Sequence, residues 1–520
     1  MLQPRSALFL ALLLAAPAAA EVSAPASVCA AEAPELDRYR LLRALSLDLR
    51  GDVPTPEEFA ALDASESIPG ALVDEWLDSE AFVGQALRHH QALLWNNVAN
   101  LTLLAATTGL TKTGQLHWRR QTAKLYRGGE LGCLDEPLET TPDGAIVSKL
   151  QPDGTSREGW IQVAPYWAPD LPIKVCGYDA QDAVISPNGS DCGTTGGFSD
   201  KGCGCGPMLR WCRGGDATAR VLEAIAGDLD RRIAAIIRDK RPYTELFTSQ
   251  TAYVNGPLVH FLRWQTNVGA NLRYEPNPVP KSKLPDLTFM DKDTWIAVDL
   301  GPEQAGILTS PAFLLRFQTQ RARANRFHNA FLCQPFQPPP GGIPFSSDKL
   351  ANHPDLQLRS GCKYCHALLE PTASYWGRWT PNGIGWLSPA AFPGKRADCE
   401  ACALTGLQCS AECKTFYITK ATSPEELPFR GWLMAYDFLR PEHVAHVEEG
   451  PRLLAMRAIV DDRLPTCVAR HAAEWLLGRA VQPEEEGWLA ETTYDFVSGG
   501  FEFRDVVKAI VTSATYRRVR

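Results

Sequence analysis

The chain has 520 residues, long enough for roughly two to four domains with cores of their own. Acidic residues outnumber basic ones, 60 to 52, which leaves a net charge of −8. This balance argues against a nucleic-acid partner, because such proteins present a basic surface to the phosphates. The chain contains fifteen cysteines. Small proteins use disulfides in place of a large hydrophobic core, but a chain of this length can form a core, so its cysteines need another explanation.

The first twenty residues have the layout of a secretory signal peptide. Arg5 precedes an apolar run over residues 7–16, and the alanines at 18–20 follow it. We expect cleavage after Ala20. No later stretch has the roughly 20 uninterrupted apolar residues that a membrane helix needs, so we expect no transmembrane segment after cleavage. The sequence therefore predicts a periplasmic, extracellular or cell-surface protein, in a compartment where thiols oxidise.

Most of the predicted elements are helices, and the first lie in the N-terminal region. Leu42, Leu45 and Leu49 repeat at helical spacing. Residues 55–58 (Thr-Pro-Glu-Glu) combine a hydroxyl cap, a first-turn proline and a reciprocating glutamate, which together indicate a helix start. The apolar pattern continues over 72–95, so we expect helices packed around a small core.

The amino-acid composition changes between residues 106 and 215, which are rich in Gly, Pro and Asp. We expect this region to be irregular and tied by disulfides, because it contains Cys133, Cys176, Cys192, Cys203, Cys205 and Cys212. Helical periodicity returns after Asp216, a plausible cap, and again over 306–334. The prolines at 338–340 mark a linker, and residues 444–517 indicate short amphipathic helices.

Residues 361–366 read Gly-Cys-Lys-Tyr-Cys-His, and Cys362, Cys365 and His366 have the spacing of c-type haem attachment. Two thiols on one helical turn can add to the two vinyl groups at one edge of a porphyrin. The histidine that follows is then held where its imidazole reaches the iron. From the Cys and His frequencies of this chain, the expected number of chance matches to the motif is on the order of 0.01 per chain. We therefore predict one covalent haem c with His366 as the proximal iron ligand.

The motif is also compatible with two uses other than haem attachment. Cys362 and Cys365 can form a short-loop disulfide beside an ordinary surface histidine, because exported chains are rich in such pairs. Zinc is less favourable, since a histidine adjacent to a cysteine cannot easily reach the same tetrahedral centre and a second ligand pair is missing. The aromatic residues that follow fit either a porphyrin wall or a plain core: Tyr375, Trp376, Trp379 and Trp386.

The ligand at the sixth coordination position of a haem iron decides whether the haem transfers electrons only or also reacts with small molecules. Met434 and His353 are the candidate distal ligands, and Met456, His443 and His446 are further candidates. If none of these residues binds, the open site would accept peroxide or a small gas.

A second group of cysteines follows the motif and contains no histidine: Cys399, Cys402, Cys409 and Cys413. The gap between its two pairs is shorter than that of a zinc ribbon, and the exported context favours oxidation. We predict two disulfides here, and disulfides also for Cys203, Cys205 and Cys212.

Several short pieces resemble one family when they are taken in chain order. They are residues 45–51, 54–58, 72–77, 242–246, 254–258, 306–311, 332–333, 338–340, 467, 477–479 and 503–513. Together they resemble the conserved helical domains of unknown function in large secreted c-type cytochrome-like proteins of planctomycetes and myxobacteria. The resemblance implies a haem protein more than it names a reaction.

The chain departs from this family just after the haem motif. Residues 370–373 (Glu-Pro-Thr-Ala) replace the usual Asp-Pro-x-Gly, while 377–379 (Gly-Arg-Trp) keep the family pattern. Because of this departure, the residues that surround the haem are expected to differ from those of the family, whereas the attachment residues are the same. His353 stands where the family often has a histidine before the motif.

The resulting prediction is a mainly α protein, with multi-domain helical bundles, irregular disulfide-rich inserts and a cytochrome-c-like segment. We divide it into a signal peptide (1–20), an N-terminal helical domain (21–105), a Cys-rich insert (106–215), a central helical domain (216–345), a haem-attachment segment with a Cys-rich insert (346–430) and a C-terminal helical domain (431–520). The expected function is single-electron transfer with an unknown redox partner protein. The alternatives are a haem peroxidase or oxygenase with an open distal site, and a haem-free disulfide-rich surface-binding protein.

Overall fold

The structure is a computed structural model, and the residues it describes are 35–94, 109–114, 116–121, 125–129, 131–194, 197–265, 279–337, 342, 349–381, 383–406 and 408–518. The expected signal peptide with its cleavage site after Ala20 and the predicted linker prolines at 338–340 lie outside the described residues, as does one of the fifteen cysteines, Cys29. Within them, helices predominate and strands are short, as expected for a mainly α chain.

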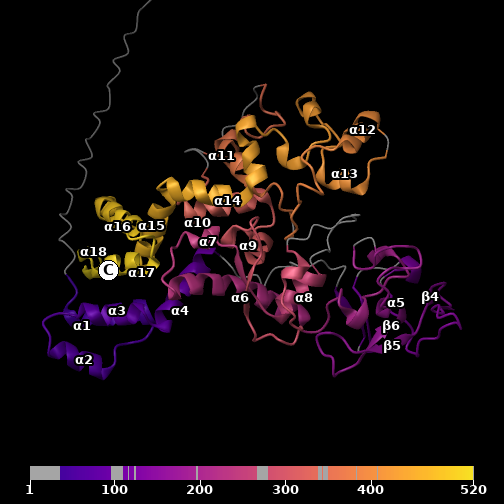
Figure 1. Ribbon diagram of the computed structural model, residues 1–520, viewed down its shortest axis with the longest axis horizontal. Coiled ribbons are helices and arrows are strands. Elements are labelled where there is room, and N and C mark those ends of the chain that lie inside the picture. Colours follow the sequence, from indigo (N-terminus) through magenta and orange to yellow (C-terminus); the bar gives the residue numbers. More distant parts are fainter. Residues whose placement is uncertain are drawn as a thin grey trace, which may run out of the picture.

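The helices at the two ends of the chain pack together at one end of the molecule (Figure 1). Leu36 donates its amide to the carbonyl of Arg517 at 2.7 Å, and Tyr516 donates its hydroxyl to Asp48 at 2.6 Å. Thr55 and Glu58 form the predicted capping box. The helices are α1 (Arg38–Arg50), α2 (Pro56–Asp63), α3 (Gly70–Leu77) and α4 (Glu80–Leu94), with α15 (Arg463–Leu477), η11 (Pro483–Glu485), α16 (Glu486–Ser498), α17 (Phe503–Thr512) and α18 (Ala514–Arg517). The preceding helix α14 (Val444–Val460) lies nearer the middle of the molecule in Figure 1.

The centre is built on α6 (Ala217–Arg238), whose apolar stripe is buried as its periodicity predicts. The side chain of Asp216 makes no capping hydrogen bond, contrary to expectation, and pairs instead with Arg220 at 2.6 Å. Around α6 lie α7 (Glu245–Thr248), α8 (Gly256–Trp264), η5 (Lys281–Lys283), η6 (Gly306–Thr309), α9 (Pro311–Arg316) and α10 (Gln320–Phe331), with β7 (Thr251–Val254) antiparallel to β8 (Ile296–Asp299).

The Cys-rich insert lies at the opposite end and contains more order than its composition indicates (Figure 1). Its strands are β1 (Leu110–Thr113), β2 (His117–Arg120), β5 (Trp160–Val163) and β6 (Ile173–Cys176), in the order β1-β2-β6-β5. Further pieces are β3 (Lys149–Leu150), β4 (Ser156–Arg157), η2 (Leu125–Arg127), α5 (Gly177–Ala180), η3 (Gly197–Ser199) and η4 (Pro207–Leu209). Strands of two to four residues are too short to show an alternating pattern, so the sequence does not reveal them.

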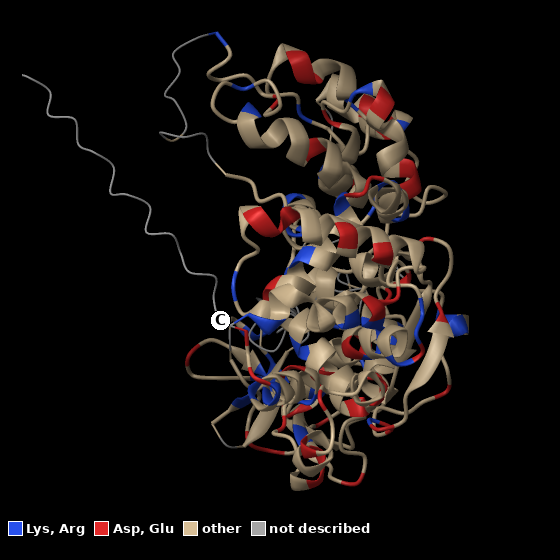
Figure 2. Ribbon diagram, turned by 90° about the vertical axis from the view of Figure 1, so that its left-hand side faces the viewer, with Lys and Arg blue, Asp and Glu red and all other residues tan. Residues whose placement is uncertain are grey.

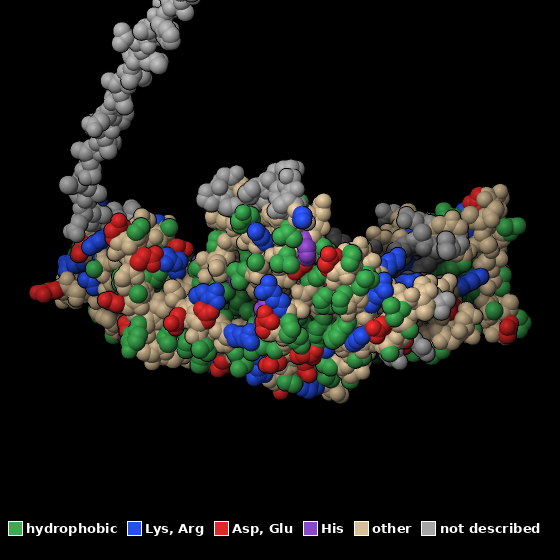
Figure 3. Space-filling view, turned by 90° about the horizontal axis from the view of Figure 1, so that it is seen from above, with side chains coloured by type: hydrophobic (Ala, Val, Ile, Leu, Met, Phe, Trp, Pro, Cys, Tyr) green, Lys and Arg blue, Asp and Glu red, His purple; other side chains and the backbone are tan. Residues whose placement is uncertain are grey.

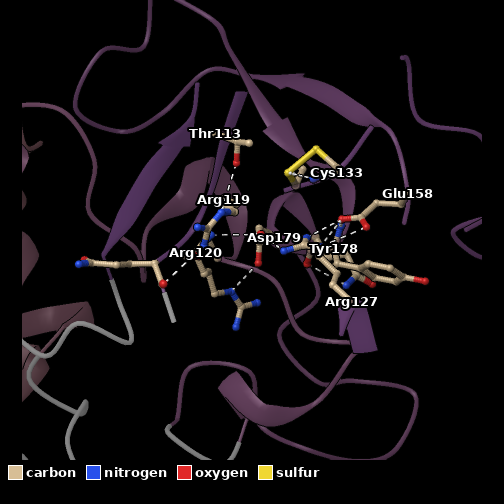
Figure 4. A network of polar contacts seen from close by, with 12 residues as sticks. Thr113, Arg119, Arg120, Arg127, Cys133, Glu158, Tyr178 and Asp179 are labelled. Carbon is tan, nitrogen blue, oxygen red and sulfur yellow. Dashed lines mark hydrogen bonds and ion pairs between the residues drawn. A yellow bond between two sulfur atoms is a disulfide. The ribbon is translucent and has the colours of Figure 1, made fainter. Parts of the chain in front are cut away.

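A buried ionic network holds this insert together (Figure 4). Asp179 Oδ1 lies 3.0 Å from Arg120 Nε, and Asp179 Oδ2 lies 2.9 Å from Arg127 Nη1. Arg127 also contacts Glu158 at 2.5 Å. All four side chains are at most 1% exposed, so two buried cations offset two buried anions.

One hydrophobic cluster extends from Leu42 to Tyr516 and includes residues of the N-terminal, central and C-terminal helical regions. A second, smaller cluster lies between Leu387 and Val447 around the second cysteine group. The elements of this part are α11 (Lys363–Ala373), η7 (Ser374–Trp376), α12 (Ala397–Thr405), α13 (Ala411–Phe416), η8 (Pro424–Phe429), η9 (Met434–Tyr436) and η10 (Pro441–His443).

Acidic and basic side chains are interspersed over the face in Figure 2. Figure 3 shows the molecule from the side on which α11 and α12 lie in Figure 1, and hydrophobic side chains gather in the middle of that face. In the part of the chain that the structure describes, no helix combines the length and the apolar character needed to cross a membrane.

Candidate haem site at helix α11

The Cys-x-x-Cys-His motif forms the first turn of α11. Gly361, whose φ of 83° suits glycine, precedes Cys362 at the N-cap position. The residues at 362, 365, 366, 369 and 370 are half-buried, whereas those at 363, 364, 367 and 368 are exposed. This is the burial pattern of a helix with one inward face. Both cysteines and His366 therefore lie on the side of α11 that faces the protein.

Six disulfides pair the cysteines outside this motif that the structure describes. They are Cys133–Cys176, Cys192–Cys203, Cys205–Cys212, Cys333–Cys467, Cys399–Cys413 and Cys402–Cys409. The two disulfides predicted for the second cysteine group are confirmed, as is the pairing of the cysteines at 203, 205 and 212. Among the described residues, Cys362 and Cys365 alone keep free thiols.

The disulfide-bonded cysteines are poor ligands for a metal ion. Three groups bring a histidine or aspartate within 4.8 Å of two cysteines: His117 with Cys133 and Cys176, His471 with Cys333 and Cys467, and Asp398 with Cys399 and Cys413. In each group the two sulfur atoms are joined as a disulfide, which leaves no thiolate to bind a metal.

The ring of His366 is oriented by a carboxylate one turn further along α11. His366 Nδ1 lies 2.5 Å from Glu370 Oε1, and Arg321 Nε of α10 donates to the same oxygen at 2.6 Å. No hydrogen bond to His366 Nε2 is found in the described part of the chain. A histidine that donates from one nitrogen to a carboxylate presents the other to a metal.

Two histidines of other helices hold the end of α11. His446 Nδ1 lies 2.8 Å from the carbonyl oxygen of Pro371, and His446 Nε2 accepts from Arg457 at 2.8 Å. His328 Nε2 lies 3.0 Å from Thr372 Oγ1. Burial lowers the pKa of both histidines, that of His328 to about 4. His446, a candidate iron ligand from the sequence, therefore has both ring nitrogens engaged.

A cavity of about 470 Å³ lies beside the buried face of α11. Its volume is within the range of about 300–1,000 Å³ for small-molecule sites. Apolar and polar side chains share the walls, with Met434 on η9 and Glu370 on α11 among them. The lining residues are 319–321, 354–357, 370, 373, 374, 377, 379–381, 387, 415, 416, 426, 433–435 and 437–439.

One wall of the cavity is held in place by Arg323 of α10, a residue that no sequence signal singled out. Its side chain is fully buried and donates to five carbonyl oxygens at 2.9–3.4 Å. Two of these belong to the cavity residues Trp379 and Thr380. Burial lowers the pKa of Arg323 to about 9.

The electrostatics of the cavity are mainly acidic. Asp437 Oδ1 is buried and has no hydrogen-bond partner among the described residues. Burial raises the pKa of Asp437 to about 6, with further contributions from Glu426, Asp355 and Glu370. All four carboxyl groups line the cavity, and Arg321 is the basic residue in the described lining.

The structure separates the candidate distal ligands. Met434 lines the cavity and is 50% exposed, whereas His353, Met456, His443 and His446 are absent from its described lining. Of the aromatic group, Trp379 lines the cavity. Tyr375 and Trp376 belong to the main core, where Trp376 Nε1 donates to the Leu308 carbonyl at 3.0 Å, and Trp386 packs against that core.

The residues present fit a c-type haem. Two free thiols on one helical turn and a histidine whose Nε2 has no hydrogen bond among the described residues can supply the bonds that this cofactor requires. The motif residues themselves are absent from the described lining of the cavity, which reaches α11 at Glu370 and Ala373, one to two turns beyond His366. An imidazole donor, a thioether donor and a wall that is partly apolar and partly acidic are also features by which proteins adjust the reduction potential of a haem. Comparisons with protein-family models, curated proteins and solved structures find no match for this chain.

Proposed function

We propose that the chain is an exported monohaem c-type cytochrome-like protein that transfers single electrons to or from a redox partner protein. Cys362 and Cys365 would hold the haem covalently, and His366 and Met434 would be the ligands of its iron. One observation carries the proposal: among the described residues, the two motif cysteines alone stay out of the disulfides. Haem attachment requires free thiols, and a short-loop disulfide would exclude it.

Export is supported by the disulfides, because such bonds persist in oxidising compartments. The protein supplies attachment, an axial histidine and a partly shielded cavity, while the cofactor supplies the one-electron chemistry. Met434 is favoured over His353 as the distal ligand because Met434 lines the cavity. The ring of His353 instead accepts the amide of Asp355 at 3.1 Å.

The test is expression of the full chain in a cell with the cytochrome c maturation machinery, followed by a pyridine haemochrome spectrum. We expect a c-type band and the mass of one haem on the mature chain. A double variant, Cys362→Ala with Cys365→Ala, should lose both. The matched control, Cys399→Ala with Cys413→Ala, removes a disulfide and should keep them. A colourless but exported wild-type protein, or a Cys362–Cys365 disulfide in its peptide map, contradicts the proposal.

A second candidate function is peroxide or oxygen chemistry, and one observation favours it. Asp437, with an unpartnered carboxyl oxygen and a pKa raised to about 6, lines the cavity and would be suited to moving a proton near neutral pH. This candidate requires an open distal position on the iron. Binding of carbon monoxide by the untreated ferrous protein would support it, and an unchanged spectrum would support electron transfer.

A further inference from the structure

Glu370 joins the motif histidine to a second helix through a single oxygen atom. Its Oε1 accepts hydrogen bonds from His366 Nδ1 at 2.5 Å and from Arg321 Nε at 2.6 Å. His366 and Glu370 are 23% and 21% exposed, so water screens their contact only in part. Arg321 reaches in from α10 and is 55% exposed.

A carboxylate in this position changes the donor strength of the imidazole. When the Nδ1 hydrogen is shared with a carboxylate, the ring gains negative character and Nε2 becomes a stronger donor to iron. Ferric iron carries one more positive charge than ferrous iron, so a stronger donor stabilises the ferric state more. The same contact fixes the ring in the tautomer that leaves Nε2 available.

We propose that Glu370 is a positioning residue that lowers the reduction potential of the haem, and that Arg321 limits this effect. The inference rests on the proposed function. The bound haem would supply a one-electron couple: one electron would pass between it and the redox partner protein without a bond forming or breaking, and Glu370 would keep its hydrogen bond with His366. Arg321 competes for the same carboxylate oxygen and therefore weakens its pull on the imidazole.

The two residues predict shifts of opposite sign, which a merely structural role does not. Glu370→Gln keeps an acceptor oxygen of the same shape but removes the charge. We expect it to favour the ferrous state by about tenfold or more, a rise of at least about 59 mV for a one-electron couple. Arg321→Gln frees the carboxylate and should favour the ferric state by about two- to threefold. The second effect is smaller because Arg321 is half exposed and its charge is screened.

The measurement is a spectroelectrochemical titration of each purified holoprotein after its haem has been confirmed by the haemochrome spectrum. Glu486→Gln is the matched control, since Glu486 loses the same charge on α16, where it pairs with Arg470 at 2.7 Å. A rise for Glu370→Gln well beyond that of the control, with a fall for Arg321→Gln, supports the inference.

A shift for Glu370→Gln that stays within about twofold of the control overturns the inference while leaving the haem in place. Absence of haem from the wild-type protein is a different failure, that of the proposed function. If Glu370→Gln yields no folded holoprotein, the reduction potential of Arg321→Gln is the test. A potential below that of the wild type supports the inference, and an unchanged or raised potential overturns it.

Discussion

The imidazole of His446 donates from Nδ1 to the carbonyl oxygen of Pro371, across 75 residues of sequence, at 2.8 Å. The same ring stacks on Tyr375 at 4.0 Å between centroids and accepts from Arg457 at Nε2. His446 thus ties α14 to the end of the helix that begins with the Cys-x-x-Cys-His motif. Because both ring nitrogens have partners, we expect His446 to hold α11 in place and not to serve as an iron ligand.

His446→Phe keeps the stacked ring but loses both hydrogen bonds. We expect the free energy of unfolding to fall by about 1–3 kcal/mol, because the Pro371 carbonyl and Arg457 lose a partner. Denaturant titration measures the change. The haem spectrum should keep its axial-ligand signature, and a loss of that signature would contradict the structural role. His443→Phe, which removes a less buried ring, is the control and should change stability by under about 0.5 kcal/mol.

Met434 provides a direct test of the distal ligand. Met434→Ala should abolish the weak long-wavelength band that sulfur ligation gives to ferric haem, and it should let carbon monoxide bind the ferrous form. Met456→Ala is a closely matched control, because Met456 is 52% exposed against 50% for Met434 but does not line the cavity. Equal spectra for the two variants would remove Met434 from the site.

Because of the ionic network around Asp179, removing this one charge should strongly reduce the stability of the Cys-rich insert. Asp179→Asn leaves Arg120 and Arg127 buried without their shared carboxylate, and such a change costs about 3–5 kcal/mol. Glu139→Gln alters the exposed pair with Lys149 and should cost under about 1 kcal/mol. Limited proteolysis within 131–194 and thermal unfolding report the difference. Similar losses for both variants would contradict the importance of the buried network.

Acid should destabilise the protein through buried histidines, of which His90 is the clearest. Its ring contacts the Ala86 carbonyl at 2.7 Å and the Tyr243 hydroxyl at 2.9 Å, and burial lowers its pKa to about 4. The unfolded chain takes up this proton near pH 6.5, so stability is complete above pH 6.5 and falls as the pH drops toward 4.

For His90 alone the loss is on the order of 3 kcal/mol. His90→Gln keeps polar contacts without a titrating ring, so its unfolding free energy should depend less steeply on pH between 6.5 and 4. Denaturant titrations at several pH values check this. Parallel curves for the wild type and the variant would show that His90 does not titrate on unfolding.

Local features of the fold could be predicted because their causes lie within a few residues. The capping box of Thr55 and Glu58 and the apolar stripe of α6 depend on helical geometry alone. Disulfides in the second cysteine group followed from spacing and compartment. The short strands of the insert could not be predicted, since tertiary contacts decide whether such short segments pair. The cap expected at Asp216 is absent for a local reason, because its carboxylate pairs with Arg220 one turn along α6.

The sequence by itself determined the chemistry that is offered at the motif: Cys362, Cys365 and His366 are neighbours on one helical turn, and their spacing needs no other part of the chain. Only the tertiary structure decided their surroundings. It brought Arg321 to Glu370 and placed Met434, rather than His353 or His446, in the cavity wall. These contacts join residues about 50 or more positions apart, and their pairing depends on how the helices pack and not on any local pattern.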